Sequence, residues 1–184
     1  MVLWRVFPFD WDDPSARPEP WSVRRDRQGG GRHDNPDVYT ALYAARDPVS
    51  AVAEFLQPFR GRMIGPAAFV RPDGRVRTLA ALDDSALPPL VDLDEPATLV
   101  RIGWRPSAIA TGVRATTQRL ALERFRDAAV GLSWWSTLEA GWTNITLFDV
   151  RVESLPEVIG MERLGLEQPA VVAAAERLSV GLRA

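Results

Sequence analysis

The sequence predicts one mixed domain of the α+β class, and three observations support this. The chain has 184 residues, the usual length of one domain, and no internal repeat. Apolar residues make up 46% and charged residues 25%, a composition typical of a globular domain with a buried core. Expected strands and helices mix without a regular β-α-β rhythm, and the chain has neither a GxGxxG turn nor a Walker loop. The sequence therefore argues against a doubly wound sheet and predicts a single domain over residues 1–184.

The N-terminal third contains the first strand and the first helix. Residues 3–9 alternate apolar and larger side chains, which predicts a strand. Residues 10–31 are rich in Pro, Asp, Arg and Gly, and we expect a long irregular segment of the kind that is often functional. A short strand is expected at 38–43. Asp47-Pro48 predicts a helix start, with aspartate as N-cap and proline in the first turn, and the helix should end near Leu56.

Turn residues separate the expected elements of the middle of the chain. Pro72-Asp73-Gly74 predicts a turn between two strands at 69–70 and 76–79. Residues 83–95 are rich in Asp and Pro, so we expect an irregular segment or a short helix. The apolar run at 98–104 predicts a strand.

The last third is expected to contain two helices and two strands. A helix that begins at one of two threonines should cover residues 116–129, with Gly131 as its C-cap. The apolar residues 132–135 and 143–152 predict strands, the second being the clearest in the chain. Residues 169–182 predict a terminal helix. The folded core is therefore expected over about residues 3–152, followed by this helix.

Composition excludes several classes of function. The net charge is −2, with 22 basic and 24 acidic residues, which argues against a broad nucleic-acid surface. The absence of cysteine excludes a disulfide framework, a thiolate nucleophile and a Cys-type zinc site. His33 is the single histidine, so we expect no metal site built on histidines. Neither a signal peptide nor a long apolar run is seen, so a soluble cytoplasmic protein without membrane contact is expected.

The segment Gly29–Arg32 is the first candidate binding element. Three glycines allow the backbone to approach a ligand closely, and the arginine that follows can bind phosphate or carboxylate in a bidentate way. A surface arginine after a flexible loop would have the same local sequence. The basic run at Arg24–Arg27 could contact RNA, although a solvated loop agrees better with the net charge.

Three further side chains are candidates for chemistry. Tyr43 could stack on a planar ring, or it could be a core tyrosine, and Tyr39 competes for the same task. Glu54 lies among small apolar residues, where it could face water or stabilise a positively charged, sugar-like transition state. Ser136 follows two tryptophans, a combination of apolar wall and polar donors that is common in ligand pockets. It could equally lie in a turn. Ser136 is not expected to act as a nucleophile, because no Gly-x-Ser-x-Gly elbow is present.

Together, five short motifs resemble the RES-domain family, which is named for its Arg, Glu and Ser. In chain order they are Trp4-Arg5-Val6, Gly30-Gly31-Arg32-His33, Leu42-Tyr43-Ala44-Ala45, Ala51-Val52-Ala53-Glu54, and Gly131 to Ser136 followed by Thr143-Asn144. The resemblance covers roughly residues 3–152. His33 stands where the family prefers Trp or Phe, Asn35 lies one position later than the usual Asn, and Trp134 or Trp135 replaces a common tyrosine.

The resemblance implies a fold and an activity. RES proteins look like ADP-ribosyltransferases, so central β-sheets flanked by helices are expected. They are mostly toxins of bacterial toxin–antitoxin pairs that consume NAD as substrate, by hydrolysis, phosphorolysis or ADP-ribosyl transfer, without a prosthetic group or metal. The implied partner is a helix-turn-helix (Xre-type) antitoxin. The chain is expected to form either a homodimer or a hetero-oligomer with this antitoxin.

The resemblance also implies roles for individual residues. Glu54, Arg32 and Ser136 become the expected catalytic residues, and Gly31, Arg32, His33, Tyr43 and Ser136 the expected NAD-binding residues. The alternative is a non-catalytic nucleotide-binding or protein-interaction domain of the same fold. An RNA-binding protein that uses Arg24 to Arg32 is the third possibility, and it would show steep salt dependence of binding.

Overall fold

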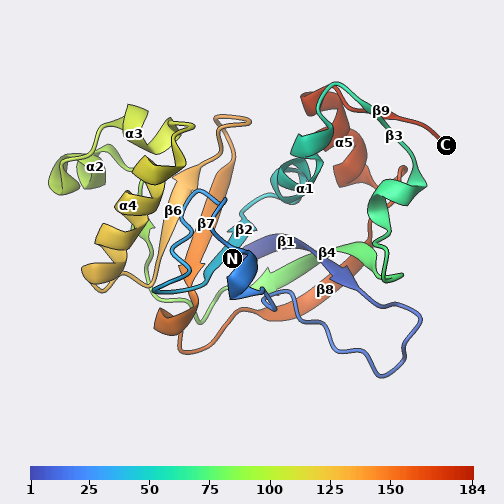
Figure 1. The fold of residues 1–184 in the computed structure, drawn as a ribbon, viewed down its shortest axis with the longest axis horizontal. Helices are drawn as coiled ribbons and strands as arrows, with labels where there is room; N and C mark the ends of the chain where they lie inside the picture. Colours follow the sequence, from blue (N-terminus) through green and yellow to red (C-terminus); the bar gives the residue numbers. More distant parts are fainter. The chain divides into compact units, whose positions relative to one another are not determined.

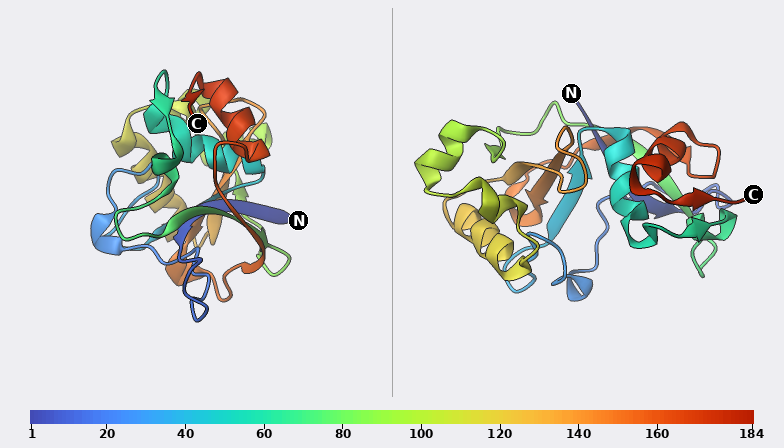
Figure 2. Two further views of the ribbon diagram at one scale, coloured as in Figure 1. Left: turned by 90° about the vertical axis from the view of Figure 1, so that its right-hand side faces the viewer. Right: turned by 90° about the horizontal axis from the view of Figure 1, so that it is seen from above.

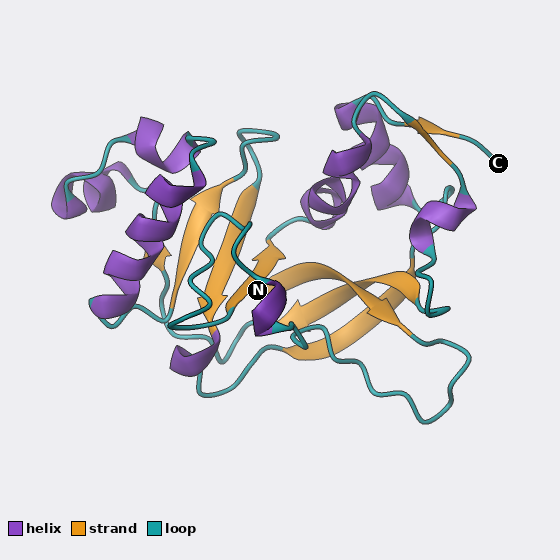
Figure 3. Ribbon diagram, in the orientation of Figure 1, coloured by secondary structure: helices purple, strands orange, loops and turns teal.

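A computed structural model describes residues 1–184, and the chain forms two compact units. The first unit consists of residues 1–20, 45–85 and 156–184. The second unit consists of residues 21–44 and 86–155. The long irregular segment that follows the first strand appears as a loop in Figure 3, interrupted by one 3₁₀ turn at Arg25–Arg27.

The first unit has three antiparallel strands in the order β1-β4-β8, together with two helices. Helix α1 lies beside α5 and also packs against β1 (Figures 1 and 2). A pair of two-residue strands, β3 and β9, runs parallel next to the end of the chain. The elements are β1 (Val2–Phe9), α1 (Pro48–Leu56), β3 (Met63–Ile64), β4 (Val76–Asp83), β8 (Glu157–Arg163), α5 (Pro169–Leu178) and β9 (Gly181–Leu182).

The second unit has four strands in the order β5-β6-β7-β2 and three helices. Strands β5 and β6 are parallel, whereas β6 and β7 are antiparallel, and α4 packs along β6 (Figure 1). Tyr39, Leu120, Leu132 and Phe148 are among the fully buried side chains of its core. The elements are β2 (Ala41–Ala45), β5 (Val91–Asp92), α2 (Pro96–Ile102), α3 (Pro106–Ala110), α4 (Arg114–Arg126), β6 (Gly131–Trp135) and β7 (Thr143–Phe148).

These elements confirm the α+β class and several of the predicted boundaries. The first strand and the first helix lie where the sequence places them, and Asp47 caps α1 by accepting the backbone N–H of Ser50 at 3.0 Å. The terminal helix begins at Pro169 as expected. It ends at Leu178 rather than residue 182, because Ser179 adopts a left-handed backbone with φ of 55°.

The predicted strand at 98–104 is wrong, since these residues belong mainly to helix α2. The Glu95 side chain accepts the backbone N–H of Ala97, Pro96 occupies the first turn, and Gly103 ends the helix with φ of 71°. These are ordinary start and stop signals of a helix, and they outweigh the β-like apolar run between them.

The prediction that Gly131 caps a helix is also wrong. Helix α4 ends at Arg126, Ala128 takes the left-handed backbone with φ of 65°, and Gly131 is the first residue of β6. A Cβ atom on Gly131 would lie 2.3 Å from the backbone oxygen of Thr146 on the adjacent strand. This glycine is therefore needed for close approach of two strands rather than for a helix end.

The other differences concern where the predicted elements begin and end, and which elements were not predicted. The strand expected at 38–43 begins at Ala41, and β7 ends at Phe148 because a 3₁₀ turn follows at Asp149–Arg151. Residues 66–69 form a 3₁₀ turn, so the expected strand at 69–70 is reduced to one bridge between Val70 and Val76. Strand β4 continues to Asp83, and β5, β8 and α3 were not expected from the sequence. None of the helices is long and apolar enough to cross a membrane.

Candidate functional site

The glycine loop, residues 29–35, is fixed from within by one carboxylate. Oδ2 of Asp34 accepts the backbone N–H of Gly29 at 2.8 Å and that of Gly31 at 2.7 Å. Gly29 has φ of 131°, a conformation that favours glycine. A Cβ atom on Gly31 would lie 2.4 Å from Oδ1 of Asp34. The glycines therefore allow the backbone to wrap around the carboxylate of Asp34, and the loop has a defined shape.

Helix α4 holds the same loop from outside. Nε2 of Gln118 donates to the carbonyl oxygens of Gly29 and Gly31, both at 2.9 Å. Oγ1 of Thr117 donates to the carbonyl oxygen of Arg32. The amide of Asn35 donates in return to the carbonyl oxygen of Gln118 at 3.0 Å. These bonds connect the loop to a packed helix, so its backbone position is set by the core of the second unit.

Arg32 is buried and links the loop to the end of helix α3. Its Nη1 donates to the carbonyl oxygens of Ile109 at 2.9 Å and Thr111 at 2.8 Å. Its guanidinium carbon lies 5.1 Å from the centre of the Trp134 ring, within the range of a cation–π contact. Both hydrogens of Nη1 are thus occupied by backbone carbonyls. Arg32 therefore has a structural role, and these contacts hold its positive charge in a fixed position.

His33 is fully buried beside Arg32 and stays uncharged. Its Nδ1 lies 2.8 Å from Oγ1 of Thr146, which also accepts the indole N–H of Trp134 at 3.0 Å. Its Nε2 has no hydrogen-bond partner. Burial, with smaller contributions from the positive charges of Arg32 and Arg114, lowers the pKa of His33 to about 3. The ring is therefore neutral at pH 7 and serves as a packed element of the site.

Tyr43 closes this network from strand β2. Its hydroxyl donates to Oδ1 of Asp34 at 2.7 Å and accepts the backbone N–H of His33 at 2.9 Å. The Tyr43 and His33 rings stack at 6.5 Å between centroids, with 25° between their planes. Burial and the negative charge of Asp34 raise the pKa of Tyr43 well above its ordinary value. Its phenol therefore remains protonated and neutral.

Acid is expected to destabilise the chain through His33. The pKa of this histidine falls from 6.5 in the unfolded chain to about 3 in the folded one, so the unfolded chain binds more protons between these values. Its contribution to stability is complete above pH 6.5 and is lost as the pH falls toward 3, by up to about 1.4 kcal/mol per pH unit.

Urea unfolding at several pH values between 4 and 7 measures this slope. His33→Phe removes the titrating group and keeps an aromatic ring, so its free energy of unfolding should fall less steeply over the same range. The comparison uses slopes rather than absolute stabilities, because phenylalanine also loses the bond to Thr146. Equal slopes in the two proteins would contradict the prediction.

Ser136 belongs to the second unit and Glu54 to the first. Ser136 follows the last residue of β6 and is buried; its backbone N–H donates to the carbonyl oxygen of Trp142 at 2.7 Å, and its Oγ accepts the backbone N–H of Leu138 at 3.1 Å. Glu54 belongs to the first unit, on helix α1, and its side chain is exposed. The structure thus brings together Gly31, Arg32, His33 and Tyr43 through Asp34 and helix α4.

Three residues that shape the loop were not singled out from the sequence: Asp34, Thr117 and Gln118. An aspartate shortly after glycines is a local signal, because Asp often accepts backbone N–H groups in turns. Thr117 and Gln118 gave no such signal, because their bonds to the loop join residues 85 to 89 positions apart.

Comparison with known proteins identifies the family of the chain. The model of the RES domain matches residues 2–166. No curated protein matches the sequence.

Among solved structures, the fold is similar to a chain of the crystal structure of the M. tuberculosis MbcT–MbcA toxin–antitoxin complex. The TM-score is 0.63 at 16% sequence identity, and the similarity covers 97% of this chain and 88% of that one. At this level of identity the similarity concerns the fold.

Proposed function

The chain belongs to the RES-domain family, and from this premise we propose that it is the toxin of a bacterial toxin–antitoxin pair that consumes NAD. One observation carries the proposal: the family match covers residues 2–166, the range in which Arg32, Tyr43, Glu54 and Ser136 lie. The similarity of fold to a chain from a toxin–antitoxin complex supports the same assignment.

The proposed reaction breaks the bond between nicotinamide and ribose. The bond's electron pair goes to the ring nitrogen, so nicotinamide leaves as a neutral molecule and positive charge develops on the ribose. An oxygen of water, phosphate or a protein side chain then bonds to the ribose carbon and loses its proton. The carboxylate of Glu54 would stabilise the developing charge or accept that proton, which are the tasks carboxylates perform in sugar transfer.

Arg32, Tyr43 and Ser136 are the proposed binding groups. The buried guanidinium of Arg32 supplies positive charge beside a loop of fixed shape, which suits the diphosphate of NAD. The Tyr43 phenol is held by Asp34 and the His33 backbone, so an aromatic face in this place would be pre-organised for nicotinamide. Ser136 would orient a ribose hydroxyl or the nicotinamide amide.

The proposed partner is an antitoxin protein, which would suppress the activity until it is removed. The resemblance implies that this antitoxin carries a helix-turn-helix domain of the Xre type. A protein that destroys NAD would otherwise harm the cell that makes it, so purification calls for removal of the antitoxin before any assay.

Nicotinamide release tests the proposed activity. Purified chain is incubated with NAD, and the products are separated by chromatography with and without added phosphate. We expect nicotinamide in both samples if water is the acceptor, and a phosphate-dependent increase with a phosphorylated ribose product if phosphate is. A third sample with cell extract detects ADP-ribose on protein. Binding of NAD in calorimetry without release of nicotinamide in any sample would contradict the proposal and favour a non-catalytic domain.

A further inference from the structure

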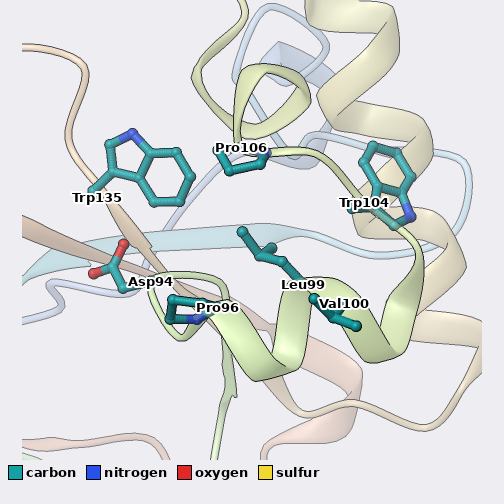
Figure 4. A pocket seen from close by; sticks show the side chains of 7 residues that line it. All are labelled: Asp94, Pro96, Leu99, Val100, Trp104, Pro106 and Trp135. Carbon is teal, nitrogen blue, oxygen red and sulfur yellow. The ribbon is translucent and has the colours of Figure 1, made fainter.

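The second unit contains a cavity of about 310 Å³ that lies outside the Arg32–His33–Tyr43 network. This is close to the lower limit of roughly 300 Å³ for small-molecule pockets. Figure 4 shows Trp135 and Trp104 on opposite sides, with Leu99 and Pro106 between them. Asp94 is the one charged residue of the lining, and its carboxylate lies on the side of Trp135.

The pocket and the site around Arg32 contact different tryptophans of β6. Trp134 and Trp135 are consecutive in β6, and successive side chains of a strand point to opposite faces. Arg32 and His33 contact Trp134, whereas the pocket is lined by Trp135. The pocket lining therefore includes neither Trp134 nor any residue of the glycine loop.

Trp135 and Asp94 differ from comparable residues of the chain, because no positively charged side chain lies against them. Trp104, Trp134 and Trp11 each have an arginine guanidinium carbon 5.1 Å from the ring centre. Trp135 has no such cation, and Asp94 has no basic partner. Asp94 accepts only neutral donors, among them the Thr143 hydroxyl at 3.2 Å.

The surroundings of Asp94 are negatively charged, so a bound cation would be favourable there. Partial burial and the neighbouring carboxylate of Asp92 raise the pKa of Asp94. Glu95 adds a third exposed carboxylate next to it in sequence. A positive group near Asp94 would be attracted by the carboxylate and by the face of Trp135 at the same time.

We propose that this pocket binds a small organic cation, an ammonium or guanidinium group on an apolar body. The charged group lies between the carboxylate of Asp94 and the ring of Trp135. The apolar body lies along Leu99 and Pro106 toward Trp104. The proposal concerns a second binding site, so it does not depend on NAD cleavage.

Binding of phenethylammonium to the full chain, measured by calorimetry or ligand-observed NMR, tests this assignment. The neutral 2-phenylethanol has nearly the same shape, and we expect it to bind about tenfold more weakly because it lacks the charge. Asp94→Asn should remove most of that preference, and Trp135→Leu should weaken binding of the cation about fivefold. Asp92→Asn is the matched control, since it removes the same charge from a residue outside the lining, and less than a twofold change is expected.

Three results would overturn the proposal. The first is equal affinity of wild-type chain for the cation and the alcohol, a comparison that does not depend on the folding of any variant. The second is an unchanged preference in Asp94→Asn. The third is displacement of phenethylammonium by NAD, which would make the pocket part of the substrate site.

Discussion

Glu54→Gln is expected to lower the rate of nicotinamide release at least about 100-fold, the usual size of effect for loss of a catalytic carboxylate. Glutamine keeps the size and hydrogen-bonding shape of the side chain but carries no negative charge, so it cannot stabilise positive charge on the ribose. Glu54 is exposed on helix α1, whose buried residues Val52, Ala53 and Leu56 are unchanged by the substitution. The substitution therefore leaves the buried face of the helix intact, and thermal unfolding checks that the variant is folded.

A matched control separates catalysis from a general effect of charge. Glu176→Gln makes the same change at an exposed position of helix α5, in the same unit of the structure. It should retain nearly the full rate of nicotinamide release. The proposed role of Glu54 is wrong if both variants release nicotinamide at the wild-type rate in the chromatographic assay.

Gly131→Ala should cause the largest loss of stability, at least about 3 kcal/mol, the upper end of the range for overpacked interiors. The added methyl group would lie 2.3 Å from the backbone oxygen of Thr146 and 3.2 Å from the Cα atom of Leu147. Backbone atoms of a paired strand cannot move away as a flexible side chain can. The strand pair β6–β7 must separate, and this disturbs the hydroxyl of Thr146 that binds His33.

Urea unfolding of Gly131→Ala measures this loss, and Gly112→Ala provides the comparison. A Cβ atom on Gly112 would meet no atom within 4 Å, so this second variant should unfold within about 1 kcal/mol of the wild type. Both glycines lie in the second unit. Equal stabilities of the two variants would show that β6 and β7 are more widely spaced than described.

The sequence predicts an element correctly where its signals are local. Asp47-Pro48 predicts the start of α1. The structure confirms Asp47 as the N-cap, since its carboxylate accepts the backbone N–H of a residue only three positions away. Helix α2 differs from the predicted strand because the local signals conflict: its apolar run is β-like, whereas Glu95, Pro96 and Gly103 mark the ends of a helix. Gly131 shows the limit of such reasoning, since its reason for being glycine lies on the adjacent strand.

In the candidate site, too, local features can be predicted from the sequence, whereas long-range contacts cannot. The position of Arg32 directly after three glycines is read from the sequence, whereas the structure shows that short-range bonds to Asp34 fix this loop. The partners of Arg32 could not be predicted, because the carbonyl groups of Ile109 and Thr111 are 77 and 79 positions away. The neutral state of His33 likewise depends on burial in a core that only the folded chain provides.

The long-range bonds of the glycine loop also determine when it can form. Arg32 needs a carbonyl 77 residues later in the chain, and His33 needs a hydroxyl 113 residues later. A ribosome makes the loop early and its partners late, so a nascent chain that stops before Thr146 lacks the contacts that shape it. Contacts between such distant residues also slow folding. The loop can therefore acquire its full set of contacts only after Thr146 has been made, and translation products that end before this residue lack them.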